Sequence, residues 1–210
     1  MNLRFGLLTF ATLAFAGAAF SQTAALDGPF QVRYAANLNI GDSVINITNS
    51  GAAESSTNIF DPGGSLCIGV YSFDPSEELL SCCTCTVTPN GLANLSVRAI
   101  NSTNLTPEVP TSLVIKLLSW NATLGCSASA PGGTTQTLSP GMLAWGTTLH
   151  AMPGTPTTYA VTETAFSPAT LSTTELNHIS SFCAFNVANG TGFGVCKGCN
   201  PGGAGAVSVQ

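Results

Sequence analysis

The amino-acid sequence predicts a mainly β protein that folds as a single antiparallel sandwich of about eight strands. Three observations predict it. Short runs rich in β-branched and aromatic residues recur along the chain, clusters of Gly, Pro, Asn and Asp separate these runs, and only one segment, near 173–188, has helical periodicity. We therefore expect an immunoglobulin-like or jelly-roll-like sandwich with one short C-terminal helix and several disulfides.

Five strands are expected in the first half of the chain. Each is a β-rich run that ends at a turn-forming cluster such as Asn49-Ser50-Gly51 or Pro89-Asn90-Gly91. In the fifth run, Leu95 and Val97 alternate with polar residues, as in a half-solvated strand. The expected strands are Gln31–Leu38, Ser43–Thr48, Leu66–Phe73, Leu79–Thr88 and Ala93–Ile100.

Three further strands and the helix follow. Thr111–Ser119 is the most hydrophobic run and is expected at the centre of a sheet. Met142–His150 and Thr157–Phe166 flank the turn Pro153-Gly154-Thr155-Pro156. A helix should begin at Ser172, because Ser172-Thr173-Thr174-Glu175 matches a capping box. Its apolar stripe would consist of Leu176, Ile179, Phe182 and Cys183.

The N-terminus has the composition of a secretory signal peptide. The single basic residue Arg4 precedes the uncharged apolar run Phe5–Phe20, and small residues follow it. Cleavage is expected after Ser21, with Gly17-Ala18-Ala19 as a competing site and an uncleaved anchor as the alternative. The expected organisation is a signal peptide over 1–21, one sandwich domain over 22–200 and a Gly-rich flexible tail over 201–210. The destination would be extracellular or the cell surface, with the periplasm left open.

Charged residues are scarce in this chain. They make up 7% of the residues, and five Lys and Arg face ten Asp and Glu, for a net charge of −5. The basic residues are scattered, so nucleic acid and anionic membrane surfaces are disfavoured as partners. No segment after the signal peptide is long and apolar enough for a membrane helix. We expect a neutral surface rich in Thr, Ser and Asn.

The eight cysteines are the main chemical feature of the sequence. An even number in an exported chain favours disulfides, although two C-x-x-C spacings, Cys82 with Cys85 and Cys196 with Cys199, leave zinc and redox thiols as alternatives. Neighbouring Cys82 and Cys83 should take different partners, and a bridge from the strand of Cys67 into their hairpin is one expectation. The disulfide candidates are Cys67, Cys82, Cys83, Cys85, Cys126, Cys183, Cys196 and Cys199.

No catalytic residue, cofactor or metal ligand is predicted. His150 and His178 are the two histidines, and neither stands in a motif with a nucleophile and a carboxylate. His178 is expected to be a solvent-facing or capping side chain, and His150 to make a structural hydrogen bond at a turn. Adjacent Glu77 and Glu78 are expected in the first turn of a short helix, where the helix dipole favours negative charge.

Calcium and sugars are the ligands that the remaining motifs suggest. The loops Asp61-Pro62-Gly63-Gly64 and Asp74-Pro75-Ser76-Glu77 could hold calcium, but turn capping is the preferred interpretation. The carboxylates Glu163 and Glu175 have no informative spacing. Aromatic side chains could form a sugar platform, although both tryptophans are expected in the core. The aromatic candidates are Tyr34, Tyr71, Trp120, Trp145 and Tyr159.

Four blocks of the sequence carry a resemblance to a known family. They are Phe73–Leu92, Ala144–Ala151, Thr162–Ser172 and Cys196–Cys199. In these blocks the chain resembles a family of exported proteins of soil bacteria that has no assigned activity. The resemblance implies a bacterial source and carries over no functional residue.

Three classes of function follow from these observations. The first is a non-catalytic structural or adhesive component of the cell exterior, such as a filament or surface-layer subunit. It would associate with itself by strand addition through its N-terminal segment or Ala206–Gln210. The alternative is a carbohydrate-binding module for surface glycans. A small secreted hydrolase is the least favoured class, because no catalytic motif is present.

Overall fold

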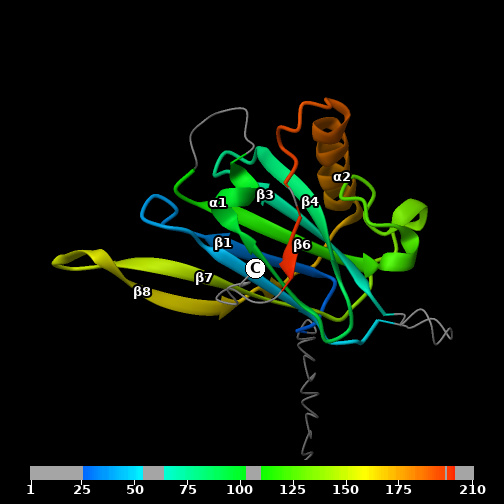
Figure 1. Ribbon diagram of the computed structural model, residues 1–210. Coiled ribbons are helices and arrows are strands. Elements are labelled where there is room, and N and C mark those ends of the chain that lie inside the picture. The colour runs from blue at the N-terminus through cyan, green and yellow to red at the C-terminus, as the bar shows by residue number, and fades with distance from the viewer. Residues whose placement is uncertain (1–25, 54–63, 103–109, 197, 202–210) are drawn as a thin grey trace, which may run out of the picture.

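The computed structural model describes residues 26–53, 64–102, 110–196 and 198–201, which form two antiparallel sheets with one long helix packed against them (Figure 1). The predicted sandwich is confirmed, with eight longer strands and two strands of two residues in these ranges. The expected signal peptide, the tail after residue 201 and most of the Asp61 loop lie outside the described residues.

The first sheet has the strand order β4-β3-β6-β1-β9. Its β3 is buried at every position, because both faces of this sheet are covered. The predicted central strand is confirmed, since β6 lies between β3 and β1. The strands are β1 (Phe30–Ala35), β3 (Leu66–Phe73), β4 (Leu79–Val87), β6 (Leu113–Asn121) and β9 (Ser167–Pro168).

The second sheet has the order β10-β5-β2-β7-β8. Along β2, buried and half-buried residues alternate, as expected for a sheet with only one covered face. Strands β7 and β8 extend past the rest of the sandwich as a two-stranded arm (Figure 1). The strands are β2 (Val44–Asn49), β5 (Leu92–Ser96), β7 (Met142–Met152), β8 (Thr155–Ala165) and β10 (Asn200–Pro201).

Two hydrophobic clusters hold the layers together. The cluster between the sheets includes Ile47 and Leu95 from one sheet and Ile68 and Ile115 from the other. The second cluster lies on the outer face of the first sheet, where the α2 helix (Thr173–Ala188) covers it. It contains Phe30, Tyr71 and Trp120 of the sheet with Leu176, Ile179 and Cys183 of the helix.

The predicted helix near 173–188 is confirmed at both ends. Ser172 is the N-cap, and its Oγ accepts a hydrogen bond from the Glu175 amide at 3.1 Å. Asn189 is the C-cap. In the predicted stripe, Phe182 differs from the other residues: it is 46% exposed and lies on the outer side of the helix.

The predicted strand Ala93–Ile100 is wrong after Ser96, where the short α1 helix (Val97–Asn101) begins. Side-chain capping explains the change. The Ser96 Oγ accepts from the Ala99 amide, and the Asp42 carboxylate accepts from the Arg98 amide. These caps satisfy the free amides of a helix start, and this outweighs the alternating pattern of the sequence.

The predicted helix start at Glu77 and Glu78 is also wrong, because these residues lie in the turn between β3 and β4. The Asp74 Oδ1 accepts hydrogen bonds from the amides of Ser76 and Glu78, each at 2.8 Å. Glu77 has a φ of 70°, which no helix contains. The Asp74 carboxylate thus caps the turn, as the preferred interpretation of this loop expected.

Candidate functional site

All eight predicted cysteines form disulfides, in four bridges: Cys67–Cys126, Cys82–Cys183, Cys83–Cys196 and Cys85–Cys199. The thiol and zinc interpretations of the C-x-x-C spacings are therefore wrong. In the described part of the chain, no group of three or more His, Cys, Asp and Glu side chains is placed to hold a metal ion.

Neighbouring Cys82 and Cys83 take different partners, as predicted. Their side chains point to opposite faces of β4, so Cys82 reaches α2 and Cys83 reaches the segment after it. The expected bridge from Cys67 into this hairpin is wrong. On β4 the residue opposite Cys67 is Thr86, and Cys82, the cysteine on the same outer face, lies opposite Tyr71. Cys67 is instead bonded to Cys126 in the loop that follows β6.

Residues 194–196 and 198–201 lie along one side of the sandwich. The Cys82 amide donates to the Gly194 carbonyl at 2.9 Å, and the Cys196 amide donates to the Cys82 carbonyl at 3.1 Å, so the edge of β4 is occupied there. The same segment continues into β10, which pairs with the edge of β5. The bridges of Cys83 and Cys85 hold this cover in place.

The β1 edge of the first sheet is covered in a similar way by β9. Ser167 and Pro168 pair with Val32 and Gln31, and the Ala169 amide donates to the Phe30 carbonyl at 3.1 Å. Three of the four sheet edges are therefore occupied by short segments. Such covers are a common way for proteins to prevent pairing between exposed strand edges.

The fourth edge, the outer edge of β8, has no described strand beside it. β8 pairs with β7 alone, and every side chain from Ala160 to Ala165 is exposed. The Phe166 amide donates to the Ala144 carbonyl of β7 at 2.8 Å. Backbone groups alternate in direction along an antiparallel strand. Because those of Phe166 point toward β7, those of Val161, Glu163 and Ala165 point away from it.

The side chains of the arm do little to protect this edge. Glu163 is the one Asp, Glu, Lys or Arg between Met142 and Ala165. On the face that carries Glu163, Trp145 is 37% exposed and lies opposite Ala165, and Val161 is 59% exposed and lies opposite Leu149. The prediction that Trp145 is in the core is therefore wrong, while Trp120 is fully buried as expected.

A buried arginine anchors the arm to the rest of the sandwich. Arg33 of β1 is 7% exposed, and its guanidinium donates to Thr148 of β7 at 2.8 Å and to Thr164 of β8 at 3.2 Å. Its Nη1 is buried and has no hydrogen-bond partner in the described residues. Burial lowers the pKa of this guanidinium. Gly146 makes room for it, since a Cβ there would overlap the guanidinium.

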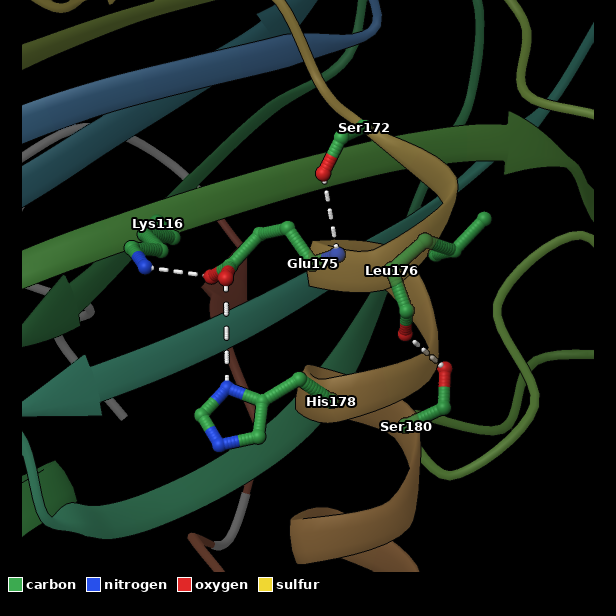
Figure 2. A network of polar contacts seen from close by, with 6 residues as sticks. All are labelled: Lys116, Ser172, Glu175, Leu176, His178 and Ser180. Atoms are coloured by element: carbon green, nitrogen blue, oxygen red, sulfur yellow. Dashed lines mark hydrogen bonds and ion pairs between the residues drawn. The ribbon is translucent and has the colours of Figure 1, made fainter.

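The two histidines do not form a catalytic arrangement with described residues. His150 Nε2 lies 2.8 Å from the Thr162 hydroxyl on the arm, but Glu163, the nearby carboxylate, is on the opposite face of β8. His178 Nδ1 lies 3.8 Å from Glu175, which binds Lys116 at 2.5 Å (Figure 2). Ser180 donates back to the Leu176 carbonyl rather than to His178. These are structural contacts, and both histidine side chains are exposed.

The carboxylates and aromatics considered from the sequence are not brought together. Glu163 belongs to the second sheet, whereas Glu175 stands on the helix that covers the first. Tyr71 and Trp120 are buried, so no platform includes all five candidate aromatics.

A second surface feature was not expected from the sequence. A groove of about 320 Å³ lies between the end of α2 and the start of β4. Three exposed aromatics line it: Phe182, Phe193 and Phe185, of which Phe185 is 66% exposed. Asn186 also lines the groove, and its side chain makes no hydrogen bond to any described residue. Helical spacing of Phe182 and Phe185 is the signal that could have indicated it.

Comparisons of the chain with protein-family models, with curated proteins and with solved structures gave no match. Among the helices that the structure describes, none has both the length and the apolar character needed to cross a membrane.

Proposed function

We propose that this protein is an exported, non-catalytic structural or adhesive component of the bacterial cell exterior, and that it associates through the outer edge of β8. The observation that carries the proposal is the contrast between this edge and the three covered ones. The four disulfides support an oxidising location, because such bridges persist mainly outside the cytosol.

Strand addition explains how such an edge acts. Backbone groups of Val161, Glu163 and Ala165 can bind the backbone of an incoming strand, which extends the second sheet by one strand. Natural edges usually carry Lys, Pro or a bulge to prevent this. The Ala160–Ala165 stretch has none of these and a single charge, so its sequence is compatible with pairing.

The assembly state of the disulfide-intact mature protein tests the proposal. Light scattering after size exclusion, over a wide range of concentration, should show association that Val161→Pro abolishes, because proline removes an outward amide without touching the ladder to β7. Val161→Thr keeps that amide and is the matched control. A wild type that stays monomeric at high concentration, with no polymer visible on cells by electron microscopy, would overturn the proposal.

A carbohydrate-binding module is the second candidate, and the phenylalanine groove favours it. Sugars stack on aromatic rings and bond to amide side chains, and Phe182, Phe185, Phe193 and Asn186 offer both in one groove. Binding to a glycan array should then fall at least tenfold in Phe185→Ala and stay unchanged in Tyr34→Ala, an exposed aromatic of β1 outside the groove. Equal, flat responses to all sugars would exclude this candidate.

A further inference from the structure

We propose that the strand that pairs with the β8 edge is β8 of a second copy, antiparallel to the first and related to it by a two-fold axis at Thr162. This inference rests on the proposed function and names its partner. It predicts a closed dimer as the unit of assembly.

The number of open edges leads to the dimer. In the described residues, short segments pair with part of each of the β4, β5 and β1 edges, and β8 has the one edge with no such segment beside it. A filament built by strand pairing needs two different adhesive edges on each molecule. A single edge can be satisfied by the same edge of a second copy, and a contact of this self-complementary kind closes after two molecules.

The direction of the backbone groups restricts where the axis can lie. The outward groups are those of Val161, Glu163 and Ala165, and in an antiparallel ladder outward residues must face outward residues. If the two-fold axis lies at a residue position, each outward residue faces another outward residue. If it lay midway between two positions, each outward residue would face one whose backbone groups point to β7. Within the central part of the edge, the axis can therefore lie at position 161, 162 or 163.

The charge of Glu163 and the regularity of the β8 strand decide among these three positions of the axis. An axis at Glu163 would place two carboxylates directly opposite each other, which is destabilising. An axis at Val161 would extend the pairing to residues 157 and 158, beyond Tyr159, where the register of β8 against β7 shifts. Such irregular stretches interrupt ladders. The regular part of β8 runs from Tyr159 to Ala165, and its midpoint is Thr162.

The axis at Thr162 gives favourable cross-strand neighbours. Thr162 faces its own copy, a type of threonine pair that stabilises antiparallel sheets, and Val161 faces Glu163 of the other molecule. The two Glu163 carboxylates are then diagonal neighbours on one face. Their repulsion should weaken the dimer, so Glu163→Gln should tighten it by about two- to fivefold.

Single added cysteines test the register directly. Thr162 is exposed, and among the described residues its side chain bonds to His150 alone, so a cysteine is tolerated there. In this register the two Cα atoms at position 162 would be about 4.5 Å apart, within disulfide range. Thr162→Cys should therefore form a covalent dimer in a glutathione buffer. Ala160→Cys is the control and should stay uncrosslinked, because its partner across the pair is Thr164. Peptide mapping would verify that the four native disulfides are intact.

The other outcomes separate this inference from the proposed function. Crosslinking of Val161→Cys or Glu163→Cys without Thr162→Cys would overturn the register. If Val161→Pro abolishes association but no cysteine variant forms a crosslink, the self-pairing is wrong. The proposed function would then stand, with the β8 edge pairing with a strand of a different protein. Absence of any association in the wild type would overturn both proposals.

Discussion

On the side of β4 and β5, residues 194–196 and 198–201 lie against the strand edges and three disulfides hold nearby segments in place, whereas on the side of β8 no described strand covers the edge. The first side is fixed by covalent bonds between segments more than 100 residues apart in sequence. The second is held by the ladder to β7 and by hydrogen bonds from Arg33, with no disulfide among its described residues. The disulfide side therefore has covered strand edges, whereas the β8 side has an edge beside which no described strand lies.

The same contrast holds for the faces of the two sheets. The first sheet has a core on both faces, one formed with the second sheet and one formed with α2. The arm of β7 and β8 has almost no core beyond Thr148, where its described side chains are exposed except for the half-buried Leu149. Stability should thus be concentrated on the disulfide side, and surface contacts should be made by the arm.

The largest expected effect is on the disulfide side. Replacing Cys83, Cys85, Cys196 and Cys199 together by Ala should lower the free energy of unfolding by about 4 to 5 kcal/mol. The bridge of Cys82 with Cys183 still closes the longest loop in this variant, so the loss comes from the two shorter rings, of roughly 16 and 7 residues, that the removed bridges close beside it. Urea unfolding measures the loss. Hydrogen exchange at the Cys82 amide should accelerate as the cover opens. Replacing Cys67 and Cys126 should leave that amide protected, and equal exchange in the two variants would contradict this account.

Two single proline substitutions compare the two sides of the β8 backbone, the side bonded to β7 and the outer side. Thr162→Pro should cost about 2 to 3 kcal/mol, because it removes an amide that points to β7 and leaves a carbonyl of Thr148 unpaired. Val161→Pro should cost less than about 1 kcal/mol in dilute, monomeric protein, since its amide points to solvent there. Thermal unfolding of both variants measures the difference. Equal costs would show that the backbone directions assigned to β8 are wrong.

The contact of Gly146 with Arg33 gives the next effect. Gly146→Ala should cost about 2 kcal/mol, because the added Cβ overlaps the guanidinium and forces it to move. The cost should shrink when the same change is made in an Arg33→Ala background. A double-mutant cycle from urea unfolding measures this coupling. Additive costs would indicate that the arm is not anchored through this contact.

The smallest expected effect lies under the loop that follows β6. Tyr71→Phe should cost about 1 kcal/mol, because the Tyr71 hydroxyl donates to the Ala128 carbonyl at 2.7 Å. Burial raises the pKa of Tyr71 above that of an unfolded tyrosine, about 10. Its contribution is therefore complete below pH about 10 and falls as the pH rises further, when the unfolded state loses its proton first. The phenylalanine variant should lose less stability than the wild type between pH 9 and about 11, measured by denaturant unfolding.

Much of the fold could be predicted because its signals are local. The alternation in Leu66–Phe73 and the capping box at Ser172 depend on a few neighbouring residues, and both elements form where expected. The errors arose where a distant side chain intervened. Asp42 helps to cap the helix that replaces the end of the fifth predicted strand, and it stands more than 50 residues before that helix.

The features that carry the proposals were less accessible to sequence reasoning. The pattern of Thr157–Phe166 predicts a strand, but the position of that strand at an edge depends on the order of strands in the sheet. The groove depends on how α2 packs beside β4, a contact fixed by the bridge of Cys82 with Cys183. Neither position leaves a local pattern that a single sequence reveals.

By itself, the sequence determined that this chain is a β-rich sandwich with one C-terminal helix and cysteines suited to disulfides, because residue propensities and short spacings act over a few neighbours. Only the tertiary structure decided which cysteines pair, which strand edges are covered and which edge stays open. Those outcomes depend on long-range packing: Cys83 meets Cys196 and β8 lies at the border of its sheet only once both sheets have assembled.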